Sequence, residues 1–153
     1  DQDPHFRITR DIAPKINKPK PALIHNIMIP ALGGPKGKMS ASNENETIYT
    51  TDSPETVKKK INKHAFSGGQ PDIEEHRKKG GNPDIDVSYQ YLRIFFEPDD
   101  KKLKQIHDDY KSGKMLTGEL KQLLIEKINK FLASHQQKRE KARDQLDKFL
   151  LKD

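Results

Sequence analysis

The chain has 153 residues, of which 31% are hydrophobic and 34% are charged, and it contains no cysteine. This length fits one domain or one domain and part of another, and the low apolar share excludes a thick hydrophobic core and favours a polar, mostly helical protein. The lack of cysteine excludes disulfides and thiolate metal sites and fits a cytoplasmic protein, and no apolar run approaches the roughly 18 residues that a membrane-spanning helix needs.

The N-terminal third of the sequence has the pattern of an α/β fold. Over residues 3–16, isoleucines recur at every fourth position after an early proline, which predicts a helix. A connector rich in Lys and Pro follows, and residues 22–29 are apolar and lie between prolines, which predicts a buried strand. His25 in this strand is expected to be a core residue. Residues 32–45 are rich in glycine and predict a loop, and residues 47–51 a short extended piece.

After Asp52 the pattern changes to a series of helices. Four times a proline follows a residue suited to a turn and precedes an acidic residue, which predicts a helix with the proline at its first position. A stripe of apolar side chains from Leu116 to Leu132 predicts that the last helix packs against the others. The expected helices span residues 54–66, 71–79, 83–96, 99–112 and 117–150.

The charge balance is 29 Lys and Arg residues against 23 Asp and Glu residues, a net charge of +6. Most of the excess lies after Asp52, in clusters at residues 58–60, 77–79 and 138–143. Such clusters neutralise phosphates and are typical of proteins that bind nucleic acids. Acidic residues are interspersed among them, however, so a solvated helical surface explains the charge at least as well. The composition leaves both interpretations open.

The string Lys38-Met39-Ser40-Ala41-Ser42 is the most informative motif in the sequence. A lysine and two hydroxyls in a loop loosened by glycine suit a triphosphate. The ammonium group can stabilise charge on a departing pyrophosphate, while hydroxyls and backbone N–H groups bind phosphate oxygens. The alternative is an exposed polar loop, which would explain an arbitrary string of this kind better. The specificity of five consecutive residues favours the phosphate-binding interpretation.

This motif resembles the KMSKS signature loop of class I aminoacyl-tRNA synthetases. Other strings narrow the resemblance to the tryptophanyl-tRNA synthetases of eukaryotic and archaeal type. Residues 1–13 (DQDPHFRITRDIA) are similar to a segment of that family, as are residues 62–69 (NKHAFSGG) and 116–120 (LTGEL). The similarity covers essentially the whole chain. Tyrosyl-tRNA synthetases share the signature loop but lack the strings at residues 9–11 and 62–69.

The resemblance implies a two-part organisation. Residues 1–52 would be the C-terminal part of a Rossmann-like α/β catalytic domain, and residues 53–153 an all-α helical anticodon-binding domain. The implied activity is that of a tryptophan–tRNA ligase, which activates tryptophan with ATP and Mg²⁺ and transfers it to tRNA(Trp). The implied protein is a cytoplasmic homodimer with no membrane partner and no metal site of its own.

The resemblance also implies roles for individual residues. Gln2 matches the glutamine that contacts the bound tryptophan. The residues that match catalytic groups are Lys38, Ser40 and Ser42, and those expected to contact ATP are Lys38, Met39, Ser40 and Asp1. The residues expected near the anticodon are Lys63, Gln70, Asp72 and Glu75. The Gln70-Pro71 pair departs from the Arg-Asp that family members often carry there.

Two further expectations concern the extent of the chain. The first residue is Asp1 rather than Met, and the HxGH motif that holds ATP in this family is absent. We therefore expect a piece of a longer chain that does not activate tryptophan by itself. The alternative function is a non-catalytic basic helical module that binds RNA or protein. That alternative explains the basic second part but leaves residues 38–42 and the Asp1-Gln2 pair without a role.

Overall fold

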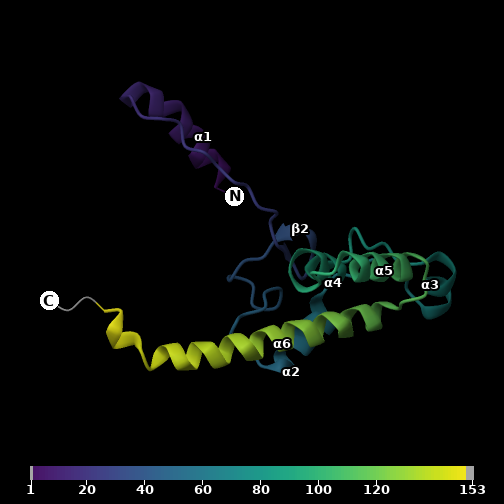
Figure 1. Cartoon of the computed structure of the whole chain (residues 1–153). Coiled ribbons are helices and arrows are strands. Elements are labelled where there is room, and N and C mark those ends of the chain that lie inside the picture. Colours follow the sequence, from purple (N-terminus) through teal and green to yellow (C-terminus); the bar gives the residue numbers. More distant parts are fainter. Residues whose placement is uncertain (1, 151–153) are drawn as a thin grey trace.

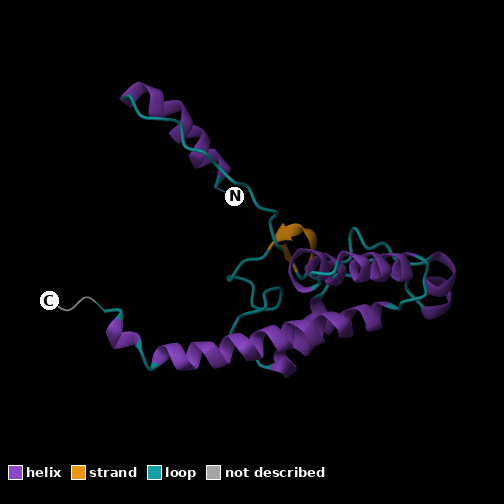
Figure 2. Ribbon diagram, viewed as in Figure 1, coloured by secondary structure: helices purple, strands orange, loops and turns teal. Residues whose placement is uncertain are grey.

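The structure is a computed structural model that describes residues 2–150. It consists of an N-terminal arm, a two-stranded hairpin and a helical body (Figures 1 and 2). The arm holds helix α1 (Asp3–Ile12) and the 3-10 turn η1 (Ala13–Ile16), and the hairpin holds β1 (Pro30–Ala31) and β2 (Gly34–Lys38). The body contains α2 (Pro54–His64), α3 (Ile73–Lys79), α4 (Val87–Tyr91), the π-helix η2 (Leu92–Phe96), α5 (Asp100–Lys111), α6 (Thr117–Arg143) and the 3-10 turn η3 (Leu146–Lys148). No helix among residues 2–150 is both long enough and apolar enough to cross a bilayer.

Helix α1 and the chain that follows it form an arm that projects away from the helical body (Figure 1). The predicted helix over residues 3–16 is confirmed, with a 3-10 last turn that ends where Asn17 adopts a left-handed φ of 55°. The predicted buried strand over residues 22–29 is wrong. These residues form no strand and most of their side chains are exposed, including that of His25. A strand needs a neighbour for its backbone hydrogen bonds, and in the described part of the chain none lies beside this segment.

The hairpin is the part of the N-terminal third that is fixed to the body. Residues 32–45 were expected to be a loop, but they contain β2, which pairs antiparallel with β1. The residue preferences of strands did not predict β2, because it contains glycines and glycine is disfavoured in strands. Leu32 is fully buried, and its carbonyl oxygen accepts a 2.8 Å hydrogen bond from the Phe66 amide, which ties the hairpin to the end of α2. Residues 47–51 form no strand.

The hydrophobic core lies along α6, which packs against α2, α4, α5 and η2 (Figure 1). The apolar stripe predicted for this helix is confirmed at Leu120, Leu124 and Ile128, which are buried, but Phe131 of the same stripe is 53% exposed. The partners from the other helices include Val57, Ile61, Val87, Tyr91, Leu92 and Tyr110. Beyond Arg143 the predicted helix ends early, and Phe149 is 79% exposed. The last apolar residues therefore do not continue the stripe.

The predicted starts of the helices are right at one proline and wrong at three. Pro54 begins α2, where the Ser53 hydroxyl oxygen accepts a 3.2 Å bond from the Thr56 amide. At α3 and α5 the residue after the proline, Asp72 or Asp99, is the cap, so both helices begin later than predicted. Pro83 lies in a turn, and Asp86 caps α4 three residues further on. A carboxylate that accepts backbone N–H groups decides the start more strongly than a preset φ angle does.

Asp86 also organises the centre of the body. Its side chain is fully buried and accepts four hydrogen bonds. One carboxylate oxygen accepts from the Gly68 amide at 2.9 Å and the Tyr110 hydroxyl at 2.8 Å, and the other from the amides of Ser88 and Tyr89 at 2.9 and 3.3 Å. One residue therefore joins α4, α5 and the turn after α2.

The buried Tyr110 hydroxyl predicts a loss of stability at high pH. Burial, together with the nearby Asp86 carboxylate, raises the pKa of Tyr110 from 10.0 to about 12. The folded protein keeps a proton that the unfolded chain releases, so this contribution is complete below pH 10 and is lost as the pH rises towards 12. We expect the free energy of unfolding to fall more steeply above pH 10 in the wild type than in Tyr110→Phe. Urea unfolding between pH 8 and pH 11.5 measures both slopes, and parallel slopes would contradict the assignment.

Candidate functional site

The signature motif forms an exposed turn at the end of β2. Lys38 is the last residue of the strand and is exposed. The Met39 amide donates a 3.0 Å bond to the Ile29 carbonyl, and its side chain packs against the core. The hydroxyl oxygens of Ser40 and Ser42 lie 2.7 Å apart. The structure thus brings the three predicted catalytic residues into one short turn, with Met39 as its anchor.

Two side chains that the sequence did not single out hold the backbone of this turn. The Thr47 hydroxyl donates to the Ser40 carbonyl oxygen at 2.6 Å, and the Tyr49 hydroxyl donates to the Ala41 carbonyl oxygen at 2.8 Å. Thr47 is 5% exposed, so its hydroxyl is a structural group rather than a surface one. No sequence motif marks these residues. Only their closeness to residues 38–42 along the sequence could have suggested a role at the turn.

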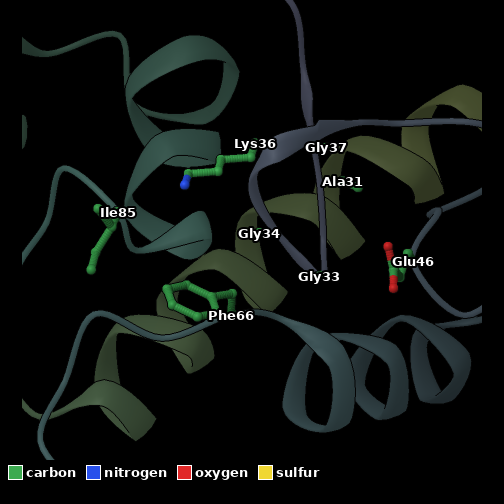
Figure 3. Close-up of a pocket in the computed structure, with 8 residues that line it drawn as sticks. All are labelled: Ala31, Gly33, Gly34, Lys36, Gly37, Glu46, Phe66 and Ile85. Atoms are coloured by element: carbon green, nitrogen blue, oxygen red, sulfur yellow. The ribbon is translucent and has the colours of Figure 1, made fainter.

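A cavity of about 430 Å³ lies between the hairpin and the helical body (Figure 3). Its lining residues are Ala31, Gly33, Gly34, Lys36, Gly37, Glu46, Phe66 and Ile85. The Glu46 side chain packs against the backbone of Gly33. A Cβ atom at position 33 would lie only 2.6 Å from the carboxyl carbon of Glu46, so the glycine makes this contact possible. Lys36 points into this space from β2 (Figure 3). The described lining does not include Lys38 or the two serines, so the cavity and the signature turn lie on different parts of the hairpin.

The residue expected to bind tryptophan lies on the arm. Gln2 lines a cavity of about 460 Å³ together with Phe6 of α1 and residues 22–28. None of residues 38–42 is among the described residues that line it, so the structure does not bring Gln2 to the signature turn. Asp1, expected near the adenosine, lies outside the described residues.

The residues expected to contact the anticodon surround the turn between α2 and α3. Gln70 and Asp72 line a cavity of about 430 Å³ with residues 116–119 at the start of α6. The Asp72 carboxylate caps α3 by accepting from the Glu75 amide, and the Glu75 carboxylate forms a 2.8 Å ion pair with Lys79 one turn further along the helix. Lys63 is exposed in the last turn of α2. The structure therefore brings Gln70 and Asp72 into one cavity, whose described lining includes neither Glu75 nor Lys63.

A buried histidine shapes this turn. His76 was given no role from the sequence, yet it is 2% exposed. Its Nε2 atom lies 2.9 Å from the Met115 carbonyl oxygen, and its Nδ1 atom lies 3.4 Å from the Gln70 amide. Because a carbonyl only accepts and an amide only donates, Nε2 carries the proton and Nδ1 accepts. The imidazole thus links the Gln70 backbone to the segment before α6. No group of three or more His, Asp or Glu side chains in residues 2–150 is placed to hold a metal ion.

Comparison with known proteins identifies the family. Residues 1–133 match the family model described as tRNA synthetases class I (W and Y), so the chain belongs to that family, as residues 38–42 and 1–13 predict. The tryptophan–tRNA ligase of Sulfurisphaera tokodaii is 60% identical over 149 residues, which are 97% of this chain and 39% of that protein. The cytoplasmic tryptophan–tRNA ligase of Homo sapiens is 56% identical over 148 residues, which are 97% of this chain and 31% of that protein.

The fold also matches this family. The solved tryptophanyl-tRNA synthetase from the hyperthermophilic archaeon Aeropyrum pernix superposes with a TM-score of 0.87 at 38% identity. The match covers 94% of this chain and 39% of that protein's chain. The chain therefore has the fold of the corresponding region of a class I synthetase. It spans 39% or less of the length of the relatives described above.

Proposed function

We propose that the chain is the part of a tryptophan–tRNA ligase that carries the signature loop and the tRNA-facing helices. The intact enzyme would activate tryptophan with ATP, release pyrophosphate and transfer the tryptophanyl group to the 3′ end of tRNA(Trp). The observation that carries this proposal is the exposed turn at Lys38, Ser40 and Ser42 in a chain 60% identical to a tryptophan–tRNA ligase. The test is tryptophan-dependent exchange of pyrophosphate into ATP by the intact protein, with the 153-residue chain alone inactive.

The chemistry of activation needs charge stabilisation rather than covalent catalysis by the protein. The tryptophan carboxylate attacks the α-phosphorus of ATP, and the bond from this phosphorus to the pyrophosphate oxygen breaks. Lys38, exposed at the end of β2, would stabilise the charge that develops on the leaving pyrophosphate. Ser40 and Ser42 would turn their hydroxyls, now 2.7 Å apart, to phosphate oxygens. Bound Mg²⁺ would neutralise part of the triphosphate charge.

The proposed domain boundary lies near residue 52. Residues 1–52 would belong to the Rossmann-like catalytic domain and residues 53–153 to the helical anticodon-binding domain. The exposed apolar side chains of the arm support the first assignment, since Ile8, Ile24 and Ile27 are 57%, 92% and 68% exposed. Apolar surface of this kind is normally covered, and the remaining catalytic domain would cover it. A homodimer is part of the same proposal.

The proposed anticodon contacts use groups of both charges. Single-stranded bases are read on their hydrogen-bonding edges, and a carboxylate accepts from the amino group of cytosine. Asp72 and Glu75 would supply such acceptors, and Gln70 would supply a side-chain amide that can donate or accept. The Lys63 ammonium group would bind phosphates of the tRNA backbone. Pro71 beside Gln70 removes a backbone donor, so the details of base contact would differ from those of relatives with Arg-Asp there.

Replacing Lys63 by alanine is expected to weaken tRNA(Trp) binding and to flatten its salt dependence. One lost phosphate contact lowers the slope of log K against log salt by about 0.7–0.9. A titration of the chain with tRNA(Trp) between 50 and 200 mM salt measures this slope. Lys101→Ala on α5 is the matched control, since it removes an exposed cation from another helix. Equal slopes for the wild type and Lys63→Ala would refute the Lys63 contact.

A further inference from the structure

The segment that follows the signature turn joins it to two helices of the body. Thr47 and Tyr49 hold the carbonyl oxygens of Ser40 and Ala41 at 2.6 and 2.8 Å. In both bonds the acceptor is a backbone carbonyl oxygen of the signature turn. Because a peptide carbonyl and the next N–H group point in opposite directions, fixing these carbonyls also fixes where the adjoining N–H groups point.

Helix α2 holds this segment through one largely buried cation. Lys60 donates from Nζ to the Thr47 carbonyl oxygen at 2.8 Å and pairs with Asp52 Oδ2 at 2.7 Å. The same ammonium lies 4.5 Å from the centre of the Tyr49 ring. The side chains of Lys60 and Asp52 are only 12% and 10% exposed, so solvent weakens this pair little. Asp52 Oδ2 also accepts from the Tyr49 amide at 2.9 Å.

Helix α6 holds the same segment from a second side. The Gln136 amide donates from Nε2 to the carbonyl oxygens of Thr50 and Asp52, at 2.9 and 3.0 Å. Gln136 lies more than eighty residues along the chain from its acceptors. Contacts from α2 and α6 thus converge on residues 47–52, which in turn hold the backbone of the signature turn.

We propose that Thr47, Tyr49, Lys60 and Gln136 are positioning residues, which we call the loop latch, for the phosphate-binding turn. The inference rests on the proposed function. The latch fixes the backbone of the turn, from which the Lys38 side chain and the two serine hydroxyls would meet the phosphates. Groups that stabilise a transition state work only when they are held in place beforehand, and a displacement of about 1 Å can cost about 100-fold in rate.

The first test is pyrophosphate exchange by the intact ligase carrying Tyr49→Phe or Thr47→Val. Tyr49→Phe keeps the ring near Lys60 and removes only the hydroxyl bond to Ala41. For each variant we expect kcat to fall by about tenfold or more, with the KM for tryptophan unchanged. Thr47→Ser keeps the hydroxyl that Thr47→Val removes, so its kcat should return most of the way to the wild-type value. Tyr89→Phe on α4 is the matched control, because it removes a hydroxyl from the body away from the turn.

Gln136→Ala tests whether α6 positions the turn through residues 47–52. We expect a fall in kcat of about threefold to tenfold with the KM for tryptophan unchanged, as for the turn-side variants. A loss that appears in KM alone, or a kcat within about twofold of wild type for both Tyr49→Phe and Gln136→Ala, would overturn the latch.

Amide hydrogen exchange of the chain itself separates the latch from the proposed function. In Tyr49→Phe we expect the amides of residues 39–43 to exchange at least about tenfold faster, with those of α5 unchanged. Unchanged exchange in residues 39–43 would overturn the latch, and faster exchange throughout α5 would show general destabilisation and also overturn it. An intact wild-type protein without tryptophan-dependent exchange of pyrophosphate would refute the proposed function, and hydrogen exchange would still decide the latch.

Discussion

Replacing Lys38 by alanine in the intact ligase is expected to slow formation of tryptophanyl-adenylate by about 100–1000-fold. The substitution removes one preorganised group that stabilises developing negative charge. Losing such a group costs about 3–4 kcal/mol of transition-state stabilisation. Lys38 is the exposed last residue of β2, so it can reach a triphosphate without a change in the core. Because the charge on pyrophosphate develops in the reaction, kcat should fall more than the affinity for ATP. Single-turnover formation of the adenylate measures the effect.

The matched control for this experiment is Lys36→Ala. Lys36 lies on the same strand, is exposed, and lines the cavity between the hairpin and the body rather than the signature turn. We expect its rate to stay within about threefold of wild type. A Lys38→Ala rate within about twofold of wild type would remove Lys38 from the proposed role, and an equal loss in both variants would point to a general effect of charge on ATP binding.

Replacing Asp86 by alanine is expected to lower the free energy of unfolding by at least about 3 kcal/mol. The substitution leaves three buried backbone N–H groups and the Tyr110 hydroxyl without their acceptor, and each orphaned buried donor costs about 1–3 kcal/mol. Small domains are stable by only about 5–15 kcal/mol, so the variant loses a large share of the total. Urea unfolding of the chain at pH 7 measures the loss.

Asp99→Ala separates burial from helix capping. Asp99 caps α5 by accepting two backbone N–H groups, as Asp86 does at α4, but it is exposed. Its removal should cost about 1 kcal/mol, because water replaces the lost acceptor. Asp86→Asn keeps one carbonyl oxygen and should fall between the two. A loss for Asp86→Ala no greater than that for Asp99→Ala would contradict the central role of the buried carboxylate.

Local patterns predicted the local features of the fold. Isoleucine spacing predicted α1, the Ser53-Pro54 pair predicted the start of α2, and the apolar stripe predicted the buried face of α6. The signature string at residues 38–42 predicted the family. Each of these inferences depends on residues within a few turns of one another, where side-chain spacing alone decides which groups meet.

The features that depend on distant contacts could not be predicted. A strand at residues 22–29 was expected from composition, but strand formation depends on a pairing neighbour that the described residues do not supply. In the sequence Asp86 is one of several aspartates close to the start of a helix, and only the fold reveals that it meets Gly68 and Tyr110. The contact of Gln136 with the segment that holds the signature turn joins residues more than eighty positions apart. No periodicity carries that information.

The signature turn is proposed to serve the activation of tryptophan with ATP. The most direct test measures exchange of labelled pyrophosphate into ATP by the intact protein, once with tryptophan and once with tyrosine as the only amino acid. The family covers ligases for both amino acids. We predict rapid exchange with tryptophan and exchange near background with tyrosine. Exchange that is faster with tyrosine, or absent with both amino acids, would contradict the account.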